Sequence, residues 1–211
     1  MFPARINAMT EKYYELAEYR ASNRNRLILA ENISHAAILE KGADRPLFRS
    51  VFWYTEDIVD YLKTNKSVSS YRGIRGIDSV PIDIDKGSNS DTYTKEKLLR
   101  FLDKLEEIGL DDQAYQIYFS GTGFHIFIDN SAFDFQPSTY LPEQVSQTLY
   151  NIGLIDDSSI IRGNQLIRLE NSLNEKSNLY KIPLSIEEVR TLSLDQIREL
   201  ARSQRLDFVV E

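Results

Sequence analysis

The pattern of apolar and polar residues along the chain is that of short helices and strands. Near the start, Thr10 is followed by an acidic residue, and this pair predicts the cap of a helix over residues 10–22. Residues 47–54 are rich in aromatic side chains and predict a strand, after which residues 55–57 begin a short helix. We therefore expect residues 1–78 to form an N-terminal α/β portion.

Beyond residue 78 the predicted elements come in a regular order. They are a strand at 80–85, a helix from Thr94 to Gly109, strands at 116–120 and 124–129, a helix at 142–153 and a strand at 159–162. This β-α-β-β-α-β order is typical of ferredoxin-like and RNA-recognition-motif (RRM) folds, in which two helices cover one face of a four-stranded antiparallel sheet. The other face of the sheet is left open for ligands.

The fold class that we expect is therefore α+β, with an RRM-like palm as its core. The palm should span residues 79–184, with a further candidate strand at 165–169 near its end. Residues 185–211 should form a C-terminal helical extension, in which Ser193 caps a helix.

The first strand of the palm carries two acidic residues. Because side chains alternate along a strand, Ile82 and Ile84 should point to one face while Asp83 and Asp85 point to the other. The two carboxylates would then lie roughly 6–7 Å apart at the backbone, close enough to share a divalent cation or to flank a pair of cations. Turns and solvated edges also use Asp freely, so this motif needs support from the rest of the chain.

The predicted hairpin places a histidine on the open face. Phe124, Ile126 and Ile128 share one parity and His125 has the other, so His125 should point away from the core. Ser120, at the end of the preceding strand, is expected to point outward as well. Together with the N–H groups of the glycines between them, these donors could cradle a phosphate chain. The alternative is a glycine hairpin with an incidental histidine.

The composition is that of a globular protein of 211 residues, with 42% hydrophobic and 27% charged residues. The absence of cysteine excludes a disulfide framework, a thiolate zinc site and a cysteine nucleophile. No run approaches the roughly 18 apolar residues of a membrane helix, and the first residues do not have the pattern of a signal peptide. We therefore expect a protein that works inside a cell, away from membranes.

The net charge of −7 argues against a tight, sequence-independent clamp on nucleic acid, because such binding depends on Lys and Arg that neutralise phosphates. It is compatible with a weak or transient hold. Acidic residues gathered at a metal site would add to the negative count, and the arginines could still form local basic surface.

Three blocks of residues in a fixed order carry a family resemblance. They are Asp83-Ile84-Asp85, then Ser120 to His125, and then Asp156 with Leu166 to Ser172, Lys176 and Lys181 to Leu184. Together they resemble the archaeo-eukaryotic primase superfamily. That superfamily includes the catalytic subunit of eukaryotic and archaeal DNA primase and the primase-polymerases of phages, plasmids and mobile elements. The resemblance covers about residues 80–184.

The resemblance implies two sets of site residues. The implied metal ligands are Asp83, Asp85 and Asp156, with Asp157 as the alternative for the third position. The implied nucleotide-binding residues are Ser120, His125, Arg168 and Lys176. Three carboxylates can hold two Mg²⁺ or Mn²⁺ ions about 3.5–4 Å apart, one to activate a 3′-hydroxyl and one to steady the leaving pyrophosphate.

The chain also departs from the family pattern. Its Ser-to-His loop is short and has Thr122 where replicative primase subunits have arginines, which suggests a phage- or plasmid-type member with weaker phosphate contact. Glu170 stands where a proline is usual, and Asn174 where some members have a histidine. These changes bear on nucleotide affinity and preference more than on the chemistry.

The function implied by the resemblance is that of a DNA primase or primase-polymerase. Such an enzyme is a metal-dependent nucleotidyltransferase that makes or extends short primers from NTPs or dNTPs on a single-stranded DNA template. A phage, plasmid or prokaryotic setting is expected, with a helicase or another replication subunit as a further partner.

Two alternatives stay open. The first is a non-catalytic RRM-like module that binds nucleic acid and whose acidic residues are incidental. Such modules stack bases on aromatic residues of the open sheet, and here only Tyr118 and Phe127 would suit that purpose. The second is another two-metal phosphoryl-transfer enzyme.

Overall fold

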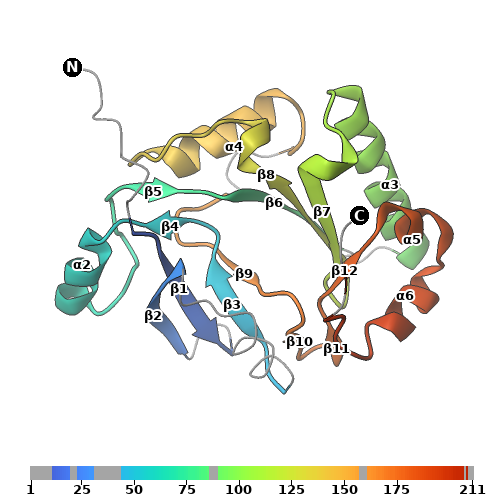
Figure 1. Cartoon of the computed structure of the whole chain (residues 1–211), viewed down its shortest axis with the longest axis horizontal. Coiled ribbons are helices and arrows are strands. Elements are labelled where there is room, and N and C mark those ends of the chain that lie inside the picture. The colour runs from blue at the N-terminus through green and yellow to red at the C-terminus, as the bar shows by residue number, and fades with distance from the viewer. Residues whose placement is uncertain are drawn as a thin grey trace. The chain divides into compact units, whose positions relative to one another are not determined.

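The computed structural model describes residues 11–19, 23–30, 44–85, 90–156, 161–206 and 208, and its helices and strands are labelled in Figure 1. The chain divides into two compact units. The first comprises residues 1–34, 48–78 and 135–167, and the second comprises residues 35–47, 79–134 and 168–211. The unit boundary after residue 78 coincides with the predicted end of the N-terminal portion, whereas residues 135–167 of the predicted palm belong to the first unit.

Most of a six-stranded sheet belongs to the first unit. Its strands are β1 (Tyr13–Glu18), β2 (Asn23–Leu29), β3 (Leu47–Ser50), β4 (Trp53–Tyr54), β5 (Arg75–Gly76) and β9 (Leu166–Arg168). Five of them follow the order β5-β4-β1-β3-β9, and β2 pairs with β1. Among the described residues of this unit, the helices are α2 (Asp57–Asn65) and α4 (Leu141–Asn151), and α4 contacts β5. The predicted strand at 165–169 and both of these helices are confirmed, whereas residues 47–54 form two short strands, β3 and β4, where one was predicted.

The helix predicted over residues 10–22 is wrong where the structure describes it, because residues 13–18 form β1 and pair antiparallel with β2. Thr10 and residues 20–22 lie outside the described residues. The reason lies in Glu15, whose buried carboxylate accepts hydrogen bonds from Arg24 Nε and Nη2 at 3.0 and 2.9 Å and from the Asn25 N–H at 2.9 Å. These partners come from the neighbouring strand, so tertiary pairing outweighs the local helix signal.

The second unit contains a four-stranded antiparallel sheet, seen in Figure 1 as β12, β7, β8 and β6 in that order. Its strands are β6 (Ser79–Ile84), β7 (Tyr115–Phe119), β8 (Phe124–Asp129) and β12 (Ile182–Leu184), and β10 (Leu173–Asn174) and β11 (Leu179–Tyr180) form a separate small ladder. The helices that the structure describes here are α3 (Asp91–Glu107), α5 (Ile186–Thr191) and α6 (Leu194–Leu200), with the 3₁₀ turns η2 (Asp112–Ala114) and η3 (Asn130–Ala132). The protein is therefore α+β with antiparallel sheets, as expected.

The strand order agrees with the predicted palm in three strands and differs in the fourth. β8 lies between β6 and β7, and α3 connects β6 to β7, as the split β-α-β arrangement requires. The strand predicted at 159–162 is wrong for residues 161 and 162, which are not in a strand, while residues 159 and 160 lie outside the described part of the chain. The fourth strand is β12, which pairs with β7.

The cap of α3 lies one turn earlier than predicted. Ser90 is the N-cap, because its side chain accepts a hydrogen bond from the Tyr93 N–H at 3.2 Å. Thr94 is buried inside the helix, where its hydroxyl donates to the Ser90 carbonyl. Gly109 follows the helix with φ 83°, which suits a glycine at a helix end, as predicted. Ser193 caps α6 with a capping box, also as predicted.

We expect Glu15→Ala to lower the free energy of unfolding by about 3 kcal/mol, because it leaves the Arg24 guanidinium without its buried carboxylate partner. Urea denaturation followed by circular dichroism measures the change. Asp60→Ala is the matched control, since the Lys63–Asp60 pair is exposed and should contribute little. Equal stability losses for the two variants would contradict the assignment of Glu15 to a buried strand position.

Candidate functional site

A row of four residues crosses the sheet of the second unit on the face opposite to its apolar core. Asp83 pairs with His125, His125 with Tyr118, and Tyr118 with Pro183. Residues directly opposite one another on paired strands share a face, so these side chains stand together. The next row, which is buried, consists of Ile82, Ile126, Ile117 and Leu184. The parity argument that placed Asp83 and His125 away from the core is confirmed.

His125 lies against Asp83, with its Nε2 3.6 Å from Asp83 Oδ1. This separation is longer than a hydrogen bond. The pKa of His125 is lowered well below 6.5, first because its side chain is buried and then because of the positive charges of Lys181 and Arg168. The imidazole is therefore neutral at neutral pH and carries one N–H donor. Its Nδ1 is buried and has no hydrogen-bond partner within the described part of the chain.

The two carboxylates at the end of β6 repel one another. Burial raises the pKa of Asp83 to about 6, and the negative charge of Asp85 adds to the rise, while Lys181, Arg168 and Lys97 act in the opposite direction. The Asp83 side chain is still 48% exposed, so water screens part of this effect. Asp85 lies just beyond β6 and is exposed. A bound cation would reduce the electrostatic repulsion between these two carboxylates.

The turn between β7 and β8 closes against the end of β6. The Ser120 N–H donates to the Gly123 carbonyl at 2.9 Å, and the Gly123 N–H donates to Ser120 Oγ at 3.1 Å. A Cβ atom on Gly123 would lie only 2.4 Å from the Ile84 carbonyl oxygen and 3.2 Å from Asp85 Cα. Glycine at this position therefore allows the turn to approach the acidic pair.

Ser120 is buried, at 3% exposure, and does not point outward as expected. Its hydroxyl oxygen closes the turn, and its carbonyl accepts hydrogen bonds from Arg168 Nη1 at 2.7 Å and from Asn174 Nδ2 at 2.9 Å. The turn of the second block and the basic residues of the third block are thus held together. Lys176 is exposed two residues beyond Asn174, whose side-chain oxygen accepts the Lys176 N–H at 3.0 Å.

The predicted site residues do not all belong to one unit. Asp83, Asp85, Ser120, His125, Arg168 and Lys176 are in the second unit, and Asp156 is in the first, where it is exposed after α4. Asp157, the alternative third ligand, lies outside the described residues. Among the residues that the structure describes, no group of three or more His, Asp or Glu side chains is placed to hold a metal ion. Asp156 as the third ligand stays a prediction.

Lys181 belongs to the third block of residues in the sequence, but no role at the site was predicted for it. Its side chain is buried, at 2% exposure, and its Nζ lies 4.6 Å from the centre of the Tyr118 ring and 4.3 Å from that of Phe127. It also donates a hydrogen bond to the Arg168 carbonyl at 2.7 Å. The signal in the sequence was a single charged residue within the otherwise apolar run Leu179 to Leu184.

Tyr118 and Glu170 form a second contact that the sequence did not indicate. The Tyr118 hydroxyl donates to Glu170 Oε2 at 3.0 Å, and the Tyr118 ring packs edge-on against Phe127 at 5.4 Å. Glu170 therefore contacts the side chain next to His125 in the cross-strand row.

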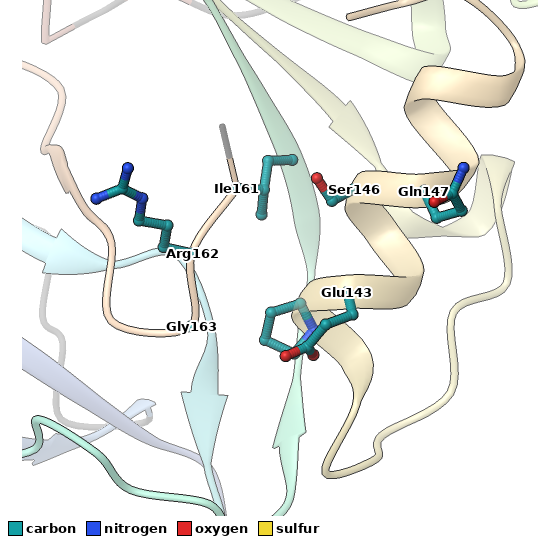
Figure 2. A pocket seen from close by; sticks show the side chains of 7 residues that line it. Glu143, Ser146, Gln147, Ile161, Arg162 and Gly163 are labelled. Carbon is teal, nitrogen blue, oxygen red and sulfur yellow. The ribbon is translucent and has the colours of Figure 1, made fainter. Parts of the chain in front are cut away.

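A pocket of about 450 Å³ lies in the first unit, and none of the predicted site residues lines it. It is lined by Pro142, Glu143, Ser146 and Gln147 of α4 and by Ile161, Arg162 and Gly163. Figure 2 shows Ile161 directed toward Ser146, whereas the Arg162 guanidinium points away from the helix. The Arg162 guanidinium, which could hold an anion, points away from the helix that lines the pocket (Figure 2). We therefore assign no ligand to this pocket.

The comparisons with known proteins supply no relative: no family model, no curated protein and no solved structure matches the chain. Within the described ranges, none of the helices has the length and apolar character needed to cross a membrane.

We expect Asp83→Asn to stabilise the metal-free protein at about pH 8 by about 1 kcal/mol, an estimate that allows for solvent screening of the half-exposed carboxylate. The folded-state pKa is raised from 3.8 to about 6. The contribution of protonated Asp83 to the free energy of unfolding is therefore fully present below pH 3.8, and it is lost as the pH rises through about 6. The asparagine side chain does not ionise, so the variant keeps this contribution at high pH.

Urea denaturation in the presence of a chelator, at about pH 4 and about pH 8, measures this difference. Asp103→Asn, on the exposed side of α3, is the control and should change stability little at either pH. A wild-type protein as stable as Asp83→Asn at the higher pH would show that the Asp83 carboxylate ionises without cost.

Proposed function

We propose that the chain is a metal-dependent, template-directed nucleotidyltransferase of the primase or primase-polymerase type. Its substrates would be NTPs or dNTPs and a single-stranded DNA template, and its product a short or extended primer. The observation that carries the proposal is the cross-strand pair Asp83–His125, which stands beside Asp85 and the Ser120–Gly123 turn on the face opposite to the core. The resemblance to the primase superfamily implies these residues in one site, together with Asp156 as a third carboxylate.

The acidic pair fits a divalent cation. Asp83 and Asp85 are exposed carboxylates close enough for the charge of one to raise the pKa of the other. Mg²⁺ is commonly held by one or two protein carboxylates, with water and substrate phosphates as the other ligands, so a pair is a sufficient donor set for one ion. When bound, Mg²⁺ or Mn²⁺ would supply charge neutralisation at the reacting phosphate and activation of the attacking hydroxyl.

The basic side of the site fits a triphosphate. The Arg168 guanidinium can form charge-assisted hydrogen bonds with phosphate oxygens, and the exposed Lys176 adds a second positive charge. His125, being neutral, can donate one N–H to a phosphate oxygen. Ser120 contributes by closing the turn, and its role as a direct phosphate contact stays a prediction. These residues bind and orient the nucleotide; none of them needs to transfer a proton.

The non-catalytic alternative is weakened by the contacts of Tyr118 and Phe127. These are the aromatic residues of the open face that could stack bases, but the Lys181 ammonium lies over both rings. The rings also pack against one another edge-on. An RRM-like binding module depends on free aromatic faces, which this arrangement reduces.

The palm architecture is supported by β6, β8 and β7, which have the order and the intervening helix of the split β-α-β arrangement. The fourth strand is β12, which pairs with β7, and it does not come from the predicted residues 159–162. A helicase or another replication subunit as a partner, and an intracellular phage, plasmid or prokaryotic setting, remain part of the proposal.

We expect Asp83→Ala/Asp85→Ala to abolish product formation, because it removes the carboxylates that would hold the cation. The assay combines the protein with a single-stranded template, NTPs or dNTPs and Mn²⁺, and resolves products on a denaturing gel. Asp103→Ala/Glu107→Ala makes the same charge change at exposed positions of α3 and should retain wild-type activity.

Template binding and phosphate release, measured on the same proteins, test the two alternatives, and product from the double variant would contradict the role of the acidic pair. Template binding that survives the double substitution, with no product from the wild type, favours the non-catalytic module. Release of phosphate without polymer favours another two-metal phosphoryl-transfer enzyme.

We expect Arg168→Ala to raise the KM for nucleotide by about tenfold and to lower kcat less, because one charge-assisted contact to the bound triphosphate is lost. Steady-state primer extension at varied nucleotide concentration measures both constants. Arg202→Ala, which removes an arginine exposed in its ion pair with Glu199, serves as the control and should change neither. An unchanged KM in Arg168→Ala would remove this residue from the nucleotide site.

A further inference from the structure

The position of Lys181 is unusual for a lysine. Its side chain is almost fully buried, and its ammonium lies within 5 Å of two aromatic rings, at 4.6 Å from Tyr118 and 4.3 Å from Phe127. Cation–π contacts of this kind favour the charged form. Burying a charge nevertheless has a desolvation cost, and an apolar side chain of similar length would fill the same space without it. Packing alone therefore does not account for a lysine here.

A chain of hydrogen bonds connects Lys181 with the predicted phosphate-binding residues. Lys181 Nζ donates to the Arg168 carbonyl at 2.7 Å, and Arg168 Nη1 donates to the Ser120 carbonyl at 2.7 Å. Asn174 Nδ2 donates to the same Ser120 oxygen at 2.9 Å. Lys181 thus holds the backbone of Arg168, and the Arg168 guanidinium in turn holds the Ser120–Gly123 turn. A shift of the Arg168 backbone would change both the guanidinium position and the turn.

The charge of Lys181 also acts on the open face. Its positive charge and that of Arg168 are felt by both Asp83 and His125, and Lys97 adds to their effect on Asp83. Asp85 opposes them. The region that would receive a triphosphate therefore has a fixed positive charge behind it, held by aromatic rings and not by a flexible surface side chain.

We propose that Lys181 is a positioning residue of the nucleotide site, which holds Arg168 and the Ser120–Gly123 turn in the arrangement that binds the triphosphate. This inference rests on the proposed function. Lys181 itself is too buried to contact the nucleotide. It acts through Arg168, so its removal should weaken binding of the phosphate chain and leave the acidic pair in place.

The test measures binding of inorganic tripolyphosphate by isothermal titration calorimetry, with a chelator present so that the cationic residues alone are probed. We expect Lys181→Met to weaken affinity by about tenfold, and Lys181→Arg, which keeps the charge but is larger than the space between the two rings, to recover only part of it. Lys63→Met, at an exposed position of α2, is the control and should bind as the wild type does. Equal affinity of wild type and Lys181→Met, with both folded, overturns the proposal.

A double substitution separates positioning from general loss of structure. If Lys181 acts through Arg168, then Lys181→Met should have little further effect in an Arg168→Ala background. Full additivity of the two effects contradicts the proposal. Should Lys181→Met fail to fold, Phe127→Leu, which removes one of the two rings around the ammonium, carries the same test with the same expected direction.

The outcomes distinguish this inference from the proposed function. A wild-type chain that binds tripolyphosphate in a Lys181-dependent manner but makes no polymer supports the positioning role and refutes the polymerase. A wild-type chain that makes polymer with an unchanged nucleotide KM in Lys181→Met supports the polymerase and refutes the positioning role. A wild-type chain that does not bind tripolyphosphate refutes the positioning role.

Discussion

The pairing register of β6 with β8 is the constraint on which the candidate site depends. Ile82 and Ile84 must face the same core as Phe124, Ile126 and Ile128, and this apolar burial fixes which residues stand opposite one another. A slip of one residue would turn Asp83 into the core and the isoleucines out, at a cost of several buried side chains. The approach of Asp83 to His125 is therefore a consequence of the hydrophobic effect acting on the other side of the sheet.

The charged groups of the site are unfavourable for the stability of the folded chain. Asp83 and Asp85 repel one another, His125 is kept neutral by burial and by nearby cations, and Lys181 is buried. Each of these features lowers the stability of the folded chain relative to an apolar alternative. Groups with strongly shifted pKa values that gather on one face are typical of functional sites. A bound ligand can offset the unfavourable charge interactions that remain in the folded chain. In the first unit, the buried carboxylate of Glu15 has a direct ionic partner in the partly exposed Arg24.

Where the sequence predicted structure well, the signal was local. The hairpin through Gly121 and Gly123, the glycine end of α3 and the Ser193 cap depend on residues within one turn of one another, and the structure has them as expected. Where prediction failed, the deciding partners came from other segments. β1 looks helical from Thr10 onward, and it is a strand because β2 supplies the partners of Glu15. The fourth strand of the second sheet comes from residues 182–184, far from where the order of elements placed it.

The sequence by itself determined the alternation that puts Asp83 and His125 away from the core, because parity along a strand needs no knowledge of its neighbours. It also determined which residue types could bind a cation and a phosphate chain. Only the tertiary structure decided that Ser120 is buried in the turn, that Arg168 is anchored to it, and that Lys181 lies between two rings. The physical reason is that burial and charge interactions depend on distances between segments, and the order of residues along the chain does not contain those distances.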